Sequence, residues 1–318
     1  MLAIVIVSWN VREHLRACLL SLQRHPATRC AQCVVVVDNA STDGTREMLR
    51  RDFPQVQALV NSTNRGFTGG NNDGLRYLEQ TGFAAEAQPA DPRFVLLLNP
   101  DAEVTPGALD ELLAYAGAHP AVGVVGPQLR YPDGAVQSSR RRFPTLLTAI
   151  FESTWLQPIA PRAVLDRYYM RGCRDDETCE VDWVVGAAML VRWETYRQVG
   201  GLDEHTFFMY SEEIDWCKRI KGAGWKVVYH PRAVVIHHEG RSSEQVVARR
   251  MIHFNTSKVR YFAKHHGRAQ AAALRLALLG MFTWQWALEA TKWLAGHRRR
   301  LRAERMQAYA RVLRSGLR

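Results

Sequence analysis

The 318-residue sequence has few cysteines. Its six cysteines are too few and too irregularly spaced for a disulfide scaffold in a chain of this length, so we expect reduced thiols. Cys30 and Cys33 form a CxxC motif, and Cys173 with Cys179 could complete four zinc ligands, but the second spacing is wide for a zinc ribbon. A redox CxxC usually follows a strand, whereas this one precedes the predicted strand at 33–37. Inert cysteines are therefore the favoured interpretation.

The usual nucleotide-binding glycine motifs are also missing. No G-x-G-x-x-G follows the first predicted strand, and no G-x-x-x-x-G-K-[ST] occurs anywhere. A sugar nucleotidyltransferase would be expected to show a glycine-rich, lysine-bearing first loop, and the loop at 8–16 reads "SWNVREHLR". If the protein binds a nucleotide, other groups must hold it.

Acidic residues are outnumbered by basic ones, 31 to 42, which gives a net charge of +11 and a pI near 9.7. This balance implies a partner of opposite sign: nucleic acid, an anionic membrane or a phosphorylated substrate. Nucleic acid is not expected, because no interleaving of aromatic and basic residues of an RRM or cold-shock kind is visible. The N-terminus has no basic n-region, so its apolar run is read as the first strand and a cytoplasmic location is expected.

The first hundred residues alternate between strand and helix patterns. Apolar, β-branched runs at 3–8 and 33–37 enclose a helical stretch with Leu15, Leu19 and Leu22 on one face. The pattern continues with a helix near 44–51, a strand at 56–60, a helix at about 70–80 and a strand at 94–98. Later segments include an apolar run from Val184 to Val191, a helix from Glu212 to Gly222 and a strand from Trp225 to His238. This alternation predicts an α/β fold with a mostly parallel central sheet flanked by helices.

Polar residues follow three of these strands. Asn10 comes after the first strand, Asp38 after the second and Asp101 after the fourth. Turn chemistry alone can explain them, because Asn, Pro and Asp all favour leaving a strand. Parallel sheets also bind ligands at the carboxyl ends of their strands, so these side chains are candidates for a binding site.

The C-terminal region from 246 to 318 is predicted to be helical and basic. Leu276 to Leu288 is uncharged but has only 13 residues, whereas about 20 are needed to span a bilayer. Trp284, Trp286 and Trp293 suit a membrane interface, and a polar face is expected from Gln285, Glu289 and Lys292. The arginine-rich end would then meet anionic lipid headgroups. The alternative is an apolar helix packed on the catalytic core, followed by a solvated basic tail.

Six ordered blocks within residues 1–245 resemble the family 2 inverting glycosyltransferases of the GT-A fold, and bacterial rhamnosyltransferase-like members in particular. The blocks are "IVIVSWN", "VVVVDNASTDGT", "NRGFTGGNN", "LLLNPDAEV", "VVGAAMLVRWETYRQVGGLDEHTFFMYSEEIDWCKRI" and "VVIHHEGRSS". The resemblance implies a GT-A domain at 1–245, with a nucleotide-binding half at about 1–100 and an acceptor and catalytic half at about 101–245. The helical region 246–318 would associate with the membrane.

The resemblance also assigns residues to a nucleotide-sugar site. Asp38 corresponds to the position that contacts the nucleotide, although with Asn39 and Ser41 it could equally form an Asx turn that caps the next helix. Arginines of "SSRRRFPT" could meet the donor diphosphate or a lipid-linked pyrophosphate; the alternative is a mobile solvated loop. The expected nucleotide-sugar ligands are Asn10, Asp38, Asp43, Gly66, Phe67, Asn99, Trp183, Gly186 and Arg142.

A divalent cation, Mg²⁺ or Mn²⁺, is implied by the acidic motif of the family. Here only the last position of "NPD" is acidic, because Asn99 stands where the first Asp is often found. One carboxylate, Asp101, suffices chemically, since diphosphate oxygens and water can complete the coordination shell. His237 or His238 resembles the histidine that some relatives add, and we assign His237 to the metal.

The catalytic base is expected at Glu213, because "SEEIDWCKR" resembles the family segment "EDxDLxxR". Clustering of Glu212, Glu213 and Asp215 tends to raise at least one carboxyl pKa. The alternative is a solvated acidic helix start favoured by the helix dipole.

These assignments together imply a metal-dependent, inverting glycosyltransferase of cell-envelope polysaccharide synthesis. It would move a sugar, with rhamnose as first choice, from a dTDP-, UDP- or GDP-sugar to a glycan or polyprenyl-diphosphate-linked acceptor. It would act at the inner face of the cytoplasmic membrane, on an anionic surface. The alternatives are a non-catalytic GT-A-like scaffold in an envelope complex and a sugar nucleotidyltransferase.

Overall fold

The computed structural model describes residues 1–83, 92–238 and 247–318, which form two compact units. The first unit comprises Met1–Phe143, Asp166–Glu204 and the described part of Glu212–Ser242. The second comprises Pro144–Leu165, His205–Ser211 and the described part of Ser243–Arg318. The segments 144–165 and 205–211 therefore group with the C-terminal helices, although the sequence assigns them to the first domain.

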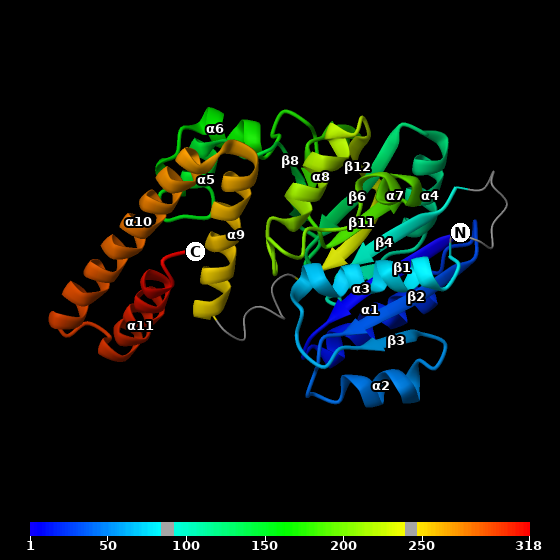
Figure 1. The fold of residues 1–318 in the computed structure, drawn as a ribbon, viewed down its shortest axis with the longest axis horizontal. Helices are drawn as coiled ribbons and strands as arrows, with labels where there is room; N and C mark the ends of the chain where they lie inside the picture. Colours follow the sequence, from blue (N-terminus) through cyan, green and yellow to red (C-terminus); the bar gives the residue numbers. More distant parts are fainter. Residues whose placement is uncertain (84–91, 239–246) are drawn as a thin grey trace. The chain divides into compact units, whose positions relative to one another are not determined.

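The first unit is built on a ten-stranded mixed sheet covered by helices (Figure 1). Its N-terminal half is a parallel array in the order β3-β2-β1-β4, made of β1 (Leu2–Ser8), β2 (Gln32–Asp38), β3 (Gln57–Val60) and β4 (Phe94–Leu98). Helices α1 (Arg12–Arg24), α2 (Thr45–Asp52) and α3 (Gly66–Gln80) lie between these strands in sequence. All seven residues of β1 are buried, because helices cover both faces of the sheet. The predicted α/β architecture is confirmed.

The other half of the sheet reverses some strand directions. The order continues β4-β11-β6-β12-β5, where β11 (Ala188–Arg192) is antiparallel to both of its neighbours. Strands β6 (Val122–Arg130) and β12 (Lys226–His237) are parallel, and β5 (Ala102–Val104) pairs antiparallel with the end of β12. Short strands β7 (Val136–Gln137) and β9 (Cys179–Val181) pair with β6 and β12. The helices of this half are α4 (Ala108–Ala118), α7 (Trp193–Val199) and α8 (Glu212–Gly222).

The apolar run from Val184 to Val191 is not a single strand. Its start belongs to β10 (Trp183–Val184), which pairs with β8 (Arg140–Arg141) in a separate two-stranded sheet. The chain then turns at Gly186 and enters β11 of the main sheet. The apolar pattern correctly indicates that the residues of β10 and of β11 are buried. It cannot show that these two strands belong to different sheets.

Within the second unit, short helices pack with three long ones. The elements are α5 (Leu146–Phe151), η1 (Gln157–Ile159), α9 (Val247–His266), α10 (Arg268–Leu294) and α11 (Arg299–Ser315). Helix α6 (Arg162–Tyr168) crosses the boundary between the units. The buried Lys258 of α9 donates hydrogen bonds to the carbonyls of Ala149 and Glu152, which lie at the end of α5. This contact explains why 144–165 groups with the C-terminal helices. Among the described residues, α10 alone has the length and apolar composition to cross a membrane.

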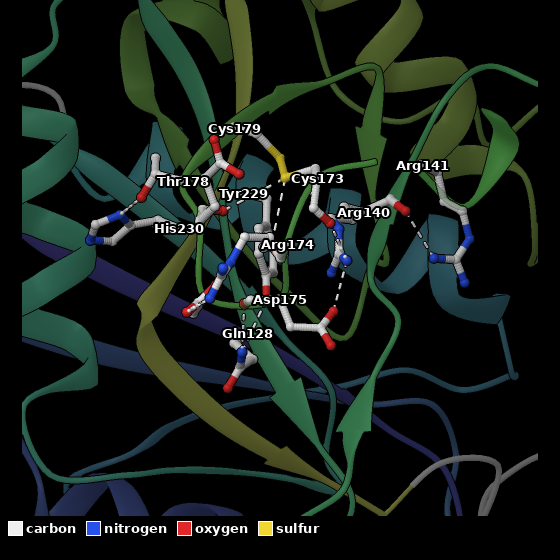
Figure 2. The surroundings of a disulfide bond; sticks show 12 residues. Gln128, Arg140, Arg141, Cys173, Arg174, Asp175, Thr178, Cys179, Tyr229 and His230 are labelled. Carbon is white, nitrogen blue, oxygen red and sulfur yellow. Dashed lines mark hydrogen bonds and ion pairs between the residues drawn. A yellow bond between two sulfur atoms is a disulfide. The ribbon is translucent and has the colours of Figure 1, made fainter. Parts of the chain in front are cut away.

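Cys173 and Cys179 form a disulfide, so the expectation of six reduced thiols is wrong for this pair (Figure 2). The intervening loop folds back and brings their Cα atoms to 6.9 Å, which their irregular spacing in sequence does not reveal. The loop is fixed to the sheet because the carbonyl of Asp175 accepts hydrogen bonds from Tyr229 and Gln128. Four cysteines are free, Cys18, Cys30, Cys33 and Cys217, and the alternative of a four-cysteine zinc site does not assemble.

Candidate active site

The ends of β1 and β2 leave two buried polar atoms without partners among the described residues. Ser8 and Asp38 are register neighbours at the carboxyl ends of these strands, and both are fully buried. One carboxylate oxygen of Asp38 accepts the backbone N–H of Ser41 at 3.1 Å, while Oδ2 and the Ser8 hydroxyl have no partner in the described chain. Buried polar atoms are rarely left unpaired. Asp38 therefore both shapes the turn and keeps an acceptor for a ligand.

Asn10 and Asp43 join the loops that follow β1 and β2. The side-chain oxygen of Asn10 accepts the N–H of Thr42 at 2.8 Å, and its backbone lies at a positive φ of 52°. Asp43 accepts the N–H of Arg12 at 2.8 Å and the hydroxyl of Thr45 at 2.6 Å. Burial opposes ionisation of Asp43, but these hydrogen bonds hold its pKa below the ordinary value. Asp43 thus holds the loop together.

The glycines of "RGFTGG" lie at the start of α3 and pack it against β1. A Cβ at Gly70 would come within 2.6 Å of Val7, and one at Gly74 within 2.4 Å of Val5. Close helix–strand packing therefore accounts for both glycines. Gly74 lies outside the "RGFTGG" motif, and nothing in the sequence pattern singles it out. The Gly66 carbonyl accepts a hydrogen bond from Asn39, which ties the start of α3 to the end of β2.

Asp101 and His237 face each other at the edge of the sheet. Asp101 lies in the turn between β4 and β5, and antiparallel pairing of β5 with β12 sets His237 opposite Ala102. The Nε2 of His237 is 3.4 Å from Asp101 Oδ1 and 3.3 Å from the amide nitrogen of Asn99. The amide oxygen of Asn99 is buried without a partner among the described residues. The side chain of His238 is bonded to Glu103, so His237 is the histidine that faces Asp101.

Gln137, which the sequence analysis misses, orients this histidine. Its Oε1 is 2.9 Å from His237 Nδ1, an arrangement that keeps a hydrogen on Nδ1 and leaves a lone pair on Nε2. Burial opposes ionisation of Asp101, but a hydrogen on Nε2 of His237, when that ring is protonated, holds the pKa of Asp101 below its ordinary value. No signal in the sequence singles out Gln137, since it lies in a two-residue strand far from the other groups.

Metal ligands from the protein would be few. No cluster of three or more His, Cys, Asp and Glu side chains suited to a metal occurs in the described ranges. Asp101, His237 and the Asn99 amide oxygen nevertheless supply oxygen and imidazole donors, and the unpartnered Asn99 oxygen fits a missing ligand. Mg²⁺ and Mn²⁺ commonly complete their coordination with phosphate oxygens and water. The residues present therefore fit a divalent cation bound together with a diphosphate.

Two adjacent glutamates begin α8, of which Glu212 is buried and Glu213 is half-buried. Within the described chain, Oε2 of Glu212 and Oε2 of Glu213 are both buried without a partner. Burial raises the pKa of Glu213 to about 7, and burial together with the Glu213 charge raises the pKa of Glu212 well above its ordinary value. Asp215 instead pairs with Arg219 at 2.9 Å, and Arg219 also donates to the carbonyls of Val199 and Gly201. Asp215 is therefore a structural brace, whereas Glu213 has the free oxygen and pKa of a general base.

The turn at Gly186 brings three separate segments together. The atoms nearest to a Cβ built at Gly186 are those of Glu213, at 3.7 and 3.8 Å, and the ring of Phe67, at 3.8 Å. The neighbouring Ala187 accepts the backbone N–H of Asn99 at 2.9 Å. The segments that carry Asp101 and Glu213 therefore meet at this turn.

Trp183 and Arg142 lie along the small β8–β10 sheet. Trp183 is buried and donates its indole N–H to the Arg142 carbonyl at 3.0 Å. The guanidinium of Arg142 is exposed and lies 3.4 Å from Asp182. Trp183 thus fixes the backbone of Arg142, while the side chain of Arg142 stays accessible.

Comparisons with known proteins agree with this geometry. Residues 1–252 match the family model described as Glycosyltransferase like family 2. The chain is 34% identical over 280 residues to the N-acetylglucosaminyl-diphospho-decaprenol L-rhamnosyltransferase of Mycobacterium tuberculosis H37Rv, covering 88% of this chain and 89% of the relative. It is 28% identical over 212 residues to rhamnosyltransferase WbbL of Escherichia coli K12, covering 63% of this chain and 70% of that protein.

Two solved structures share the fold. One is the mannosyltransferase PcManGT from Pyrobaculum calidifontis in complex with GDP-Man and Mn²⁺, with a TM-score of 0.55, 17% identity and coverage of 98% of this chain and 84% of that chain. The other is GalNAc-T7 with UDP, GalNAc and Mn²⁺, with a TM-score of 0.54, 14% identity and coverage of 74% and 43%.

Proposed function

This chain belongs to glycosyltransferase family 2, and on that premise we propose that it is an inverting rhamnosyltransferase of cell-envelope polysaccharide synthesis. The donor is a nucleotide-sugar, dTDP-rhamnose in the first instance. The acceptor is a sugar carried on a polyprenyl diphosphate, as the name of the mycobacterial relative indicates for that protein. A lipid-linked acceptor places the reaction at the cytoplasmic face of the membrane. The observation that carries the proposal is the Glu213 side chain at the Gly186 turn, where one buried carboxylate oxygen has no partner among the described residues.

Glu213 acts as the general base. Its free carboxylate oxygen takes the proton from the acceptor hydroxyl, and the hydroxyl oxygen attacks the anomeric carbon of the donor. The bond between that carbon and the diphosphate oxygen breaks on the opposite side, so one displacement inverts the configuration. Base catalysis of this kind contributes about 10² to 10⁴ in rate.

Asp101, His237 and Asn99 would hold a Mg²⁺ or Mn²⁺ ion against the donor diphosphate. When bound, the cation stabilises the negative charge that develops on the departing nucleoside diphosphate. Gln137 keeps the Nε2 lone pair of His237 directed at the site, and Asp38 offers its unpartnered oxygen to the nucleotide.

A transfer assay tests this function. The purified protein is incubated with dTDP-rhamnose, Mn²⁺ and a polyprenyl-diphosphate-linked N-acetylglucosamine, and the anomeric configuration of the product is read by NMR. We expect a rhamnosylated lipid with inverted configuration. A retained configuration would refute the mechanism, and absence of transfer from a full panel of dTDP-, UDP- and GDP-sugars would favour a scaffold. Formation of a nucleotide-sugar from a nucleoside triphosphate and a sugar phosphate would identify a nucleotidyltransferase.

A further inference from the structure

Helix α10 turns its acidic residue inward, toward α11. The two helices run side by side as an antiparallel hairpin (Figure 1). The carboxylate of Glu289 is buried and accepts hydrogen bonds from Arg302 at 2.7 and 3.1 Å, with Arg305 at 3.6 Å. At the other end of α10, Arg275 donates to the carbonyl of Gly316 beyond the end of α11. Of the predicted polar face, Glu289 is therefore covered by α11, whereas Lys292 is exposed.

The opposite face of α10 is exposed and apolar. At 100° per residue, Leu276, Gly280, Thr283, Ala287 and Leu294 form one line along the helix. Leu276 and Leu294 are 70% and 69% exposed, and Trp284 and Trp286 on either side of the line are 54% and 38% exposed. Between Arg275 and Lys292 the only ionisable residue is Glu289, which points the other way. We call this line with its two tryptophans the α10 apolar face.

An ordinary surface helix hides its apolar residues and exposes its polar ones. Helix α10 departs from this pattern, because it buries Glu289 and exposes Leu276, Trp284 and Leu294. A contiguous exposed patch of this kind marks an interaction surface. Cationic side chains follow it directly: Lys292, Arg298 and Arg299 are exposed, and the guanidinium of Arg299 lies 5.5 Å from the Trp293 ring centroid. Apolar side chains and tryptophans next to arginines match an anionic membrane interface.

The dimensions favour lying on the membrane over crossing it. The uncharged stretch from Leu276 to Leu288 is about 20 Å long as a helix, against a hydrocarbon core of about 30 Å. A deeper position would take the Glu289–Arg302 ion pair into lipid, which is costly. We propose that α10 docks in the plane of an anionic membrane through its apolar face, with α11 on the aqueous side and Arg298 and Arg299 on the headgroup phosphates. Docking through α10 would bring the enzyme to its lipid-linked acceptor, and in this respect the inference rests on the proposed function.

The apolar part of the proposal is tested by vesicle flotation of the full-length chain. We expect Leu276→Gln with Trp284→Gln to weaken partition onto phosphatidylcholine–phosphatidylglycerol vesicles at least about tenfold, because apolar area drives the insertion. The matched control is Trp155→Gln with Ile159→Gln, which removes similar side chains, 44% and 71% exposed, from the segment after α5 in the same unit. The control should bind as the wild type does. Unchanged thermal unfolding of both variants shows that the fold is kept.

The electrostatic part needs a second matched pair. Arg298→Gln with Arg299→Gln should lower partition about tenfold on anionic vesicles and leave the weak binding to pure phosphatidylcholine unchanged. The matched control is Arg311→Gln with Arg314→Gln, which removes the same charge from two exposed positions of α11. By helical periodicity these positions lie opposite the Arg302 face. This variant should change partition onto anionic vesicles less than about threefold.

Three results would overturn docking through this face. Equal partition of the Leu276/Trp284 variant and the wild type would exclude it, and so would resistance of the vesicle-bound protein to alkaline carbonate, which indicates a spanning helix. Loss of a dimer in the variant without loss of vesicle binding would assign the face to a second copy of the chain. Vesicle binding requires no turnover, so a failed docking test leaves the transfer assay unaffected, and the reverse also holds.

Discussion

Individual carboxylates in this protein differ in function because their surroundings differ. Asp43 accepts hydrogen bonds from Arg12 and Thr45, and Asp215 pairs with Arg219, so both carboxylates hold loops and helices in place. Glu213 and Asp38 each keep a buried oxygen without a partner in the described chain. The second group therefore has a free acceptor for a substrate.

Glu213→Gln should abolish transfer while leaving donor affinity nearly unchanged. The amide keeps the shape of the side chain but cannot accept the acceptor's proton, so kcat should fall by about 10² to 10⁴. Steady-state kinetics with donor titration by calorimetry measures both quantities. The matched control is Glu212→Gln on the preceding residue, for which we expect a change of less than about tenfold in kcat. Full activity of Glu213→Gln would reject the base assignment.

The pH profile should show an acidic limb near 7. Because burial raises the pKa of Glu213 to about 7, the carboxyl is protonated below that pH and cannot act as a base. We expect kcat/KM to rise as pH increases through 7. The linked effect on stability has the opposite sign: as pH rises from the ordinary carboxyl pKa to about 7, the wild type loses stability relative to Glu213→Gln, because the unfolded state ionises first. Melting curves of both proteins across this range check the sign, and an acidic limb near the ordinary carboxyl pKa would contradict the assignment.

Metal affinity should depend on His237 and not on His238. His237→Ala removes a donor that faces Asp101, whereas His238→Ala removes a side chain bonded to Glu103. Gln137→Leu should raise the Mn²⁺ concentration for half-maximal activity about 10- to 100-fold through loss of the orienting hydrogen bond. Metal titrations of the three variants provide the measurement. Equal Mn²⁺ requirements of the His237→Ala and His238→Ala variants would contradict the proposed metal site. Undiminished activity of the wild-type protein in excess EDTA would contradict it as well.

Short elements, more than long ones, position the site. Strand β5 has three residues, yet its pairing with β12 sets His237 beside Asp101. Strands β8 and β10 have two residues each, and the turn after β10 brings Gly186 to Glu213. The Cys173–Cys179 loop supports the same region, since Asp175 forms a 2.7 Å ion pair with Arg140 of β8.

Removal of the disulfide should lower stability without abolishing folding. The cysteines are six residues apart, and closing so short a loop contributes about 2 kcal/mol in the chain-entropy model. Cys173→Ser with Cys179→Ser should therefore unfold at a lower denaturant concentration than the wild type, while Cys30→Ser, which replaces a free thiol, should not. Alkylation of both Cys173 and Cys179 in the untreated folded protein would show that the bond is absent.

The molecule as a whole combines a carboxylate-lined site with a strong positive charge. The net charge of +11 suits a chain that handles diphosphates and anionic lipid. Individual arginines need not be assigned to a site for this to hold, since the summed field of the surface charges attracts an anion.

Donor identity can be read from the stability of the whole chain. A nucleoside diphosphate that binds only the folded state at 100 times its Kd stabilises it by about 2.7 kcal/mol. We expect dTDP with Mn²⁺ to raise Tm by about 5 °C in the wild type and by much less in Asp101→Ala. Thermal shift against dTDP, UDP and GDP makes the measurement. A larger shift with UDP or GDP would reassign the donor, and an equal shift without Mn²⁺ would contradict the role of Asp101.

The amino-acid sequence by itself determined the alternation of strands and helices and the position of Asn10, Asp38 and Asp101 at the ends of strands. Local patterning suffices for this, because burial of β1 and β4 between layers requires unbroken apolar runs. The family motifs likewise predicted Glu213 as the base.

Tertiary structure alone showed that His237 faces Asp101 while His238 is bonded to Glu103, that Gln137 contacts His237, that Cys173 and Cys179 are joined, and that 144–165 groups with the C-terminal helices. Each depends on pairing between segments far apart in the chain, for which neighbouring residues carry no signal. The same reason applies to α10: its composition shows apolar and basic residues, but only the packing of α11 over Glu289 decides which face of the helix meets the solvent.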